Sequence, residues 1–108
     1  MAAAPPPLPP VRLRPEEIAA VKRIVAEHFG PDAEVRVFGS RARLDARGGD
    51  LDLHVRVPGG TPPFAVEVRV GNVLEKAMDD RHVDLILLGT ADTPRRIDEV
   101  ALETGVLL

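Results

Sequence analysis

The sequence predicts an α/β fold in which helices cover a small β-sheet. Segments whose apolar residues recur at helical spacing alternate along the chain with segments that alternate polar and apolar residues. Hydrophobic residues make up 44% of the chain and aromatic residues only 3%, with neither Trp nor Tyr. The core must therefore consist of Val, Leu, Ile and Ala, as in buried aliphatic strands. A chain of 108 residues is long enough for one such domain.

The first helix is expected to begin near Pro15. Proline is favoured in the first turn, and Glu16 and Glu17 follow where the helix dipole stabilises acidic side chains. Apolar residues then recur at helical spacing, and Gly30 ends the helix. The apolar set is Ile18, Val21, Ile24, Val25 and Phe29.

Three segments are expected to form strands. Residues 34–38 alternate polar and apolar side chains, and residues 83–88 form an apolar run interrupted only by Asp84. Residues 50–57 have the clearest pattern, with one face apolar and the other polar. The apolar face holds Leu51, Leu53, Val55 and Val57, and the polar face holds Asp50, Asp52, His54 and Arg56.

Further helices bring the expected number to about four. A short helix is expected at residues 41–44, a longer one at residues 64–78 and a last one at residues 94–103. The inward side chains are expected to be Val66, Val70, Val73, Leu74 and Ala77 in the longer helix, and Ile97, Val100 and Ala101 in the last. Residues 1–13, rich in Ala and Pro, are predicted to be a disordered tail, and residues 14–108 to form the domain.

Composition excludes several classes of protein. The net charge of −3 gives no electrostatic basis for direct binding of nucleic acid. Without cysteine, neither a disulfide framework nor a thiolate metal site is possible. No secretory signal stands at the N-terminus and no stretch is apolar enough to span a membrane, so we expect no membrane partner and a cytoplasmic location.

Three acidic residues suggest a metal site. Asp50 and Asp52 lie on one face of a strand, about 6.5–7 Å apart along the backbone, and they repel each other unless a cation lies between them. Asp84 lies in an apolar strand, where an unpaired carboxylate is costly to bury. If the two strands are neighbours, the three carboxylates converge. Oxygen-only ligation of this kind suits Mg²⁺.

A glycine at a strand end suggests a phosphate site beside these acids. Gly39 allows the backbone to approach a ligand, and a helix that starts near Ser40 would direct free N–H groups at phosphate. Arg41 and Arg43 can offset the charge of a triphosphate.

The stretch from Val37 to Arg43, then Asp50-Leu51-Asp52-Leu53 and Val83-Asp84-Leu85, resembles the nucleotidyltransferase pattern of the DNA polymerase β superfamily. The likeness is to its minimal nucleotidyltransferase branch and runs from about Pro15 to the C-terminus. It implies a mixed sheet flanked by helices, with Asp50 and Asp52 binding two Mg²⁺ ions and Asp84 ligating one metal and orienting the attacking hydroxyl. Gly39 and Ser40 would hold the β- and γ-phosphates of the donor, expected to be ATP. Members often have Gly where this chain has Leu44, and a polar residue where it has Gly49.

The same resemblance implies a partner. Minimal nucleotidyltransferases of this kind are commonly paired with HEPN-domain RNase toxins, which they silence as antitoxins by adenylylation. Two alternatives remain: an antitoxin that acts by binding alone, and the catalytic subunit of an enzyme that modifies small molecules such as aminoglycosides.

Histidines and acids outside the pattern are expected to have structural roles. His54 shares a face with Asp50 and Asp52, but three alternate residues span about 13 Å, too far for one ion. We therefore expect His54 to be a surface residue or to lie behind the metal ligands. His82 is expected to lie just outside its strand and to point the same way as Asp84. Asp98 is expected in a turn, a helix cap or a solvated face.

Overall fold

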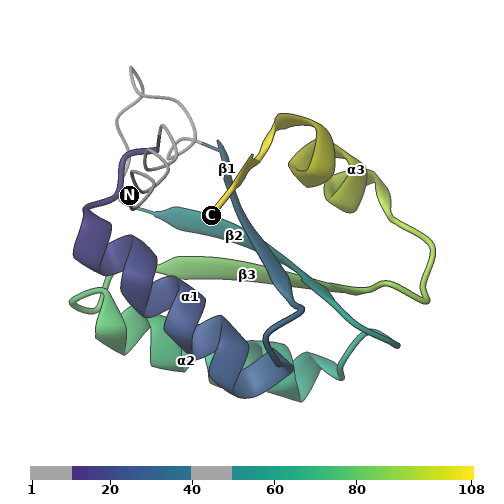
Figure 1. Ribbon diagram of the computed structural model, residues 1–108, viewed down its shortest axis with the longest axis horizontal. Helices are drawn as coiled ribbons and strands as arrows, with labels where there is room; N and C mark the ends of the chain where they lie inside the picture. Colours follow the sequence, from purple (N-terminus) through teal and green to yellow (C-terminus); the bar gives the residue numbers. More distant parts are fainter. Residues whose placement is uncertain (1–10, 40–49) are drawn as a thin grey trace, which may run out of the picture.

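The computed structural model describes residues 11–39 and 50–108 (Figure 1). Its elements are α1 (Pro15–Phe29), β1 (Glu34–Phe38), β2 (Leu51–Val57), α2 (Phe64–Ala77), β3 (Val83–Gly89), α3 (Arg96–Thr104) and β4 (Val106–Leu107). The α/β prediction is confirmed, with three helices in the described part of the chain. The short helix expected at residues 41–44 lies outside the described residues, as do Ser40, Arg41 and Arg43.

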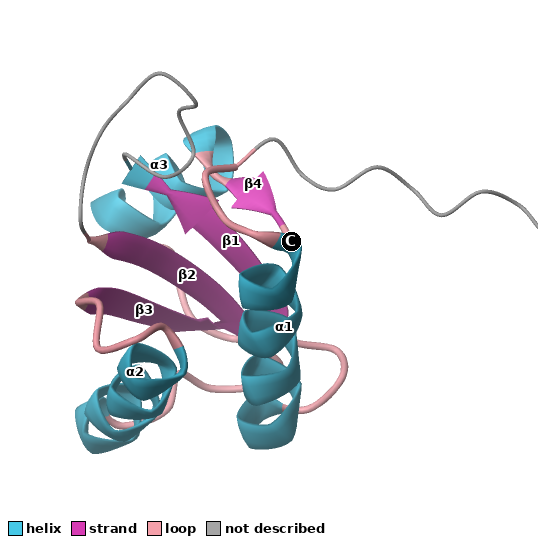
Figure 2. Cartoon of the chain, turned by 90° about the vertical axis from the view of Figure 1, so that its left-hand side faces the viewer, coloured by secondary structure: helices cyan, strands magenta, loops and turns pink. Residues whose placement is uncertain are grey.

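The four strands form one mixed sheet in the order β3-β2-β1-β4. β1 pairs antiparallel with both β2 and β4, whereas β2 and β3 run parallel. A parallel pair needs a crossover connection, and α2 supplies it between β2 and β3. Figure 2 shows α1 and α2 on one side of the sheet and α3 on the other.

The main core lies between the sheet and the pair of helices α1 and α2. Alternate residues of β2 face these helices and are buried, as the sequence pattern predicts. Val11 is only 7% exposed and Leu13 packs against the same core. These two side chains precede the predicted boundary at residue 14 and are already part of the packed core.

Two predicted helix faces are partly wrong. In α2, Val70, Gly71 and Leu74 form a narrow buried stripe, while Val73 and Ala77 are exposed. In α3, Ile97 is 40% exposed and Val100 39% exposed, and only Ala101 of the predicted inward set is buried. The reason is that α3 contacts the sheet on the face away from the main core, through Ala101 and the buried carboxylate of Asp98. Among the described residues, no helix is long and apolar enough to cross a membrane.

Candidate functional site

Asp52 and Asp84 lie side by side at one end of the sheet. They are register partners in the parallel pair β2–β3, and Asp52 is also the partner of Phe38 at the end of β1. Opposite residues on neighbouring strands point to the same face, so the two carboxylates share the face away from α1 and α2. Asp50 is exposed and directly precedes β2. The sheet thus brings together two of the three predicted acids and leaves the third beside them.

The proximity of these acids raises the pKa of Asp52. Partial burial is the largest cause, followed by the charge of Asp84, a hydrogen bond between the two carboxyl groups and the charge of Asp50. The positive charge of His82 acts in the opposite direction. Asp52 therefore carries its negative charge at an energetic cost, and a bound cation would relieve that cost.

Gly39 brings the backbone close to the same acids. It follows β1 directly and has a φ of +71°, a left-handed conformation that side chains other than glycine rarely adopt. A Cβ atom on Gly39 would collide with the carboxylate of Asp52. Any larger residue would therefore displace the acid or the chain. Ser40, Arg41 and Arg43, the remaining predicted phosphate-binding residues, lie outside the described part of the structure.

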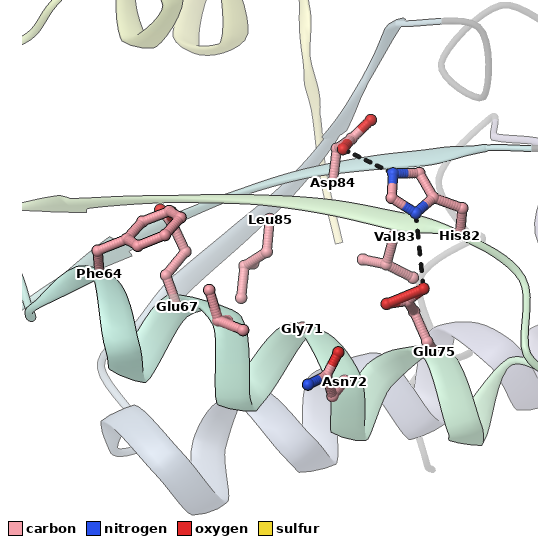
Figure 3. Close-up of a pocket in the computed structure, with 10 residues that line it drawn as sticks. Phe64, Glu67, Gly71, Asn72, Glu75, His82, Val83, Asp84 and Leu85 are labelled. Carbon is pink, nitrogen blue, oxygen red and sulfur yellow. Dashed lines mark hydrogen bonds and ion pairs between the residues drawn. The ribbon is translucent and has the colours of Figure 1, made fainter.

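His82 connects the acids to α2. It lies just before β3 and on the side of Asp84, as predicted, and its Nε2 is 2.9 Å from Oδ1 of Asp84. Its Nδ1 is 3.5 Å from Oε1 of Glu75 (Figure 3). The hydrogen bond with Asp84 is the main reason that the pKa of His82 is raised. Sequence reasoning missed Glu75, because no local pattern indicates which residue of α2 faces the start of β3.

The carboxylate oxygens of Asp52 and Asp84 are ligands that suit Mg²⁺, although they do not surround an ion completely. Within residues 11–39 and 50–108, no three His, Cys, Asp or Glu side chains are arranged to hold a metal ion by themselves. Mg²⁺ usually keeps several waters and takes phosphate oxygens as further ligands, so one or two carboxylates are enough to recruit it. Asp52 and Asp84, with Asp50 adjacent, could supply these oxygens.

His54 is buried, so of the two positions expected for it, the one at the surface is wrong. Its side chain is completely buried, and its Nε2 lies 2.9 Å from Oδ1 of Asp98 at the start of α3. Burial lowers the pKa of His54, and the hydrogen bond and charge of Asp98 only partly oppose this effect. A neutral imidazole can donate from Nε2 to the carboxylate, so this hydrogen bond links β2 to α3.

Asp98 does cap a helix, but it is buried rather than solvated. Its Oδ2 accepts hydrogen bonds from the backbone N–H of Arg95 at 2.8 Å and from Nε of Arg95 at 2.9 Å. Burial alone would raise the pKa of Asp98, but hydrogen bonds from Arg95 and His54 outweigh it and lower the pKa to about 2. This ionised group joins the cap of α3 to the strand that carries Asp52.

Comparison with protein families identifies the class of protein. The family model described as nucleotidyltransferase domain matches residues 18–105, and the chain belongs to this family. The match covers every helix of the described structure at least in part, and β1, β2 and β3 completely. A comparison with curated proteins finds no matching sequence. Membership of the family supports a transferase that moves nucleotidyl groups.

Proposed function

We propose that the protein transfers AMP from ATP to a hydroxyl group of a partner protein, with Mg²⁺ as cofactor. The observation that carries this proposal is the meeting of three strands at one point. The end of β1 supplies Gly39, and the starts of β2 and β3 supply Asp52 and Asp84 in register. Gly39 has no side chain, so phosphate groups can approach its backbone, and the paired carboxylates of Asp52 and Asp84 can hold the metal bound to them.

Each residue has a separate task in the proposed reaction. Asp50, Asp52 and Asp84 would hold Mg²⁺, which would neutralise charge on the triphosphate and on the departing pyrophosphate. Gly39 lets the main chain approach the phosphates, as Ser40 would from the next position. The acceptor oxygen forms a bond to the α-phosphorus while the bond to pyrophosphate breaks, and the hydroxyl proton passes to solvent. Asp84, which is the more exposed of the paired acids, accepts a hydrogen bond from the attacking hydroxyl and orients it.

The surface beside Asp84 favours a macromolecular acceptor. It is an open groove between α2 and β3, whereas small-molecule sites are usually concave and enclose most of the ligand. On the strength of the family resemblance, we propose a HEPN-domain RNase as acceptor, with this protein acting as its antitoxin.

Label transfer tests this proposal. The purified protein is incubated with Mg²⁺, ATP labelled on the α-phosphate and the product of the adjacent gene. We expect label on the partner, and its loss in the double variant Asp50→Asn/Asp52→Asn. Asp32→Asn, which changes an exposed acid in the turn after α1, is the matched control and should transfer normally.

The outcome separates catalysis from binding. If the double variant transfers as much label as the wild type, Asp50 and Asp52 do not support catalysis and the proposal is wrong. If the double variant transfers no label but still neutralises the RNase activity of its partner, the antitoxin acts by binding alone.

A further inference from the structure

β3 is an edge strand, and half of its backbone groups face away from the sheet. The N–H of Leu51 bonds to the C=O of His82, and the N–H of Thr90 bonds to the C=O of Val57. The peptide groups of even-numbered residues along β3 therefore face β2. Because these groups alternate along a strand, those of Val83, Leu85 and Leu87 face outward.

In the C-terminal half of β3, side chains form hydrogen bonds with the outward backbone groups. Glu67 accepts a hydrogen bond from the N–H of Leu87 at 3.1 Å, and Arg95 donates to the C=O of the same residue at 3.3 Å. The N–H of Gly89 bonds to the hydroxyl of Thr61 at 2.8 Å. Natural proteins cover sheet edges in this way to prevent unwanted pairing.

In the N-terminal half of β3, beside Asp84, the outward backbone groups are left unpaired by the described residues. No described residue makes a hydrogen bond to the outward groups of Val83 or Leu85. These groups flank Asp84, whose side chain points to the face of the proposed active site. In the described part of the structure, the outer edge of β3 is therefore available for pairing only beside Asp84.

Gly71 keeps this part of the edge accessible. Glu67, Gly71 and Glu75 are spaced four residues apart on the side of α2 that faces β3. Glu67 caps the edge and Glu75 contacts His82, but Gly71 has no side chain, and a Cβ there would meet nothing within 4 Å. The result is a groove of about 290 Å³, visible in Figure 3.

We propose that an extended segment of the acceptor protein binds in this groove as an added strand of the sheet, beside β3. This inference rests on the proposed function, because it identifies how the acceptor hydroxyl reaches the site. The segment would pair with the outward groups of Val83 and Leu85. Its residue opposite Asp84 would then point to the same face, with the two Cβ atoms about 4.5–5.5 Å apart. A Ser or Thr hydroxyl there lies within reach of the Asp84 carboxylate, and a Tyr reaches it from the diagonal position.

The groove also defines which flanking residues the segment should carry. Three acids line it, with His82 between two of them, and none of the described Lys or Arg residues does. The acids are Glu67, Glu75 and Asp84. Phe64, 75% exposed, and Val68, 45% exposed, add apolar surface at the end away from His82. The acceptor segment is therefore expected to carry Lys or Arg near the hydroxyl residue and an apolar side chain further along.

Backbone-modified peptides test the pairing directly. The probe is a library of short synthetic peptides with a central Ser, Thr or Tyr and varied basic and apolar flanking residues, assayed with labelled ATP and Mg²⁺. The best acceptor is then resynthesised with N-methyl groups on the amides that would pair with Val83 or Leu85. Loss of those hydrogen bonds should reduce kcat/KM about ten- to a hundredfold, with the side chains unchanged.

A protein variant tests the groove independently. Gly71→Leu places a side chain into the open space beside the edge and should reduce peptide labelling by a similar factor. Gly71→Ala adds only one methyl group and favours the helix, so it shows whether the position tolerates substitution. Arg69→Leu adds an apolar side chain at an exposed position of α2 outside the groove and should leave labelling unchanged.

The controls separate this inference from the proposed function. Cleavage of ATP to AMP and pyrophosphate with water as acceptor, abolished by Asp52→Asn, reports nucleotidyl transfer without any peptide. If this reaction occurs but no peptide is labelled, the groove proposal is wrong and nucleotidyl transfer stands. Equal labelling of N-methylated peptides, or full activity of Gly71→Leu on peptides, also overturns the proposal. If no ATP is cleaved and no label is transferred, the proposed function is itself wrong and this inference falls with it.

Discussion

The substitution Asp98→Asn tests the contact that fastens α3 to the sheet. The Asp98 side chain is completely buried and receives hydrogen bonds from Arg95 and His54. Asn retains the shape of the side chain and one oxygen acceptor, but it removes the negative charge that these donors stabilise. The variant therefore isolates the electrostatic contribution of the carboxylate from its contribution to packing.

The lowered pKa of Asp98 sets the size of the effect. The folded state holds this pKa at about 2, against an ordinary value of 3.8. One pKa unit corresponds to about 1.36 kcal/mol, so ionised Asp98 contributes about 2 kcal/mol to the free energy of unfolding. Because the folded pKa is the lower one, this contribution is complete at pH 7 and is lost as the pH falls through 3.8 towards 2. For a domain of this size, we expect the melting temperature of Asp98→Asn to fall by about 10 °C at pH 7.

Urea unfolding at pH 7 in the presence of EDTA measures the effect. The matched control is Asp32→Asn, which makes the same change at an exposed acid in the turn after α1. The control should leave the urea midpoint unchanged. A loss below about 0.5 kcal/mol in Asp98→Asn, the range of ordinary surface substitutions, would refute the argument.

Three further predictions concern the site and its supporting strand. Asp52→Asn removes a negative charge that repels those of Asp50 and Asp84, so it should raise the melting temperature in EDTA. It should also reduce the further rise in melting temperature on adding MgCl₂, because a metal ligand is lost. Thermal scans in both buffers measure the two effects. Gly39→Ala should lower both the melting temperature and the rate of nucleotidyl transfer, because its Cβ meets the Asp52 carboxylate. His54 has a lowered pKa when folded, so protonation favours the unfolded chain and stability should fall as the pH drops below 6.5. In His54→Gln, urea midpoints between pH 7 and pH 5 should fall less than in the wild type.

Much of the fold could be predicted from local pattern. The proline and acids at the start of α1, and the alternation along β2, depend only on neighbours in the chain, and the structure places both elements where they were expected. The face of β2 that carries Asp52 follows from the same alternation, since a strand has only two faces. The pairing of Asp52 with Asp84 was conditional on β2 and β3 being neighbours, and the sheet order fulfils that condition.

The sequence by itself thus determined which residues share a face, and the tertiary structure decided what covers each face. His54 and Asp52 alternate on one side of β2, yet α3 buries His54 completely while Asp52 remains partly open. Periodicity cannot distinguish these outcomes, because the position of α3 depends on contacts with residues more than forty positions away in the chain, such as the hydrogen bond between His54 and Asp98. The open edge beside Asp84 has the same origin. It exists because β3 is the last strand of the sheet and Gly71 of α2 faces it, and both facts arise only when the chain is folded.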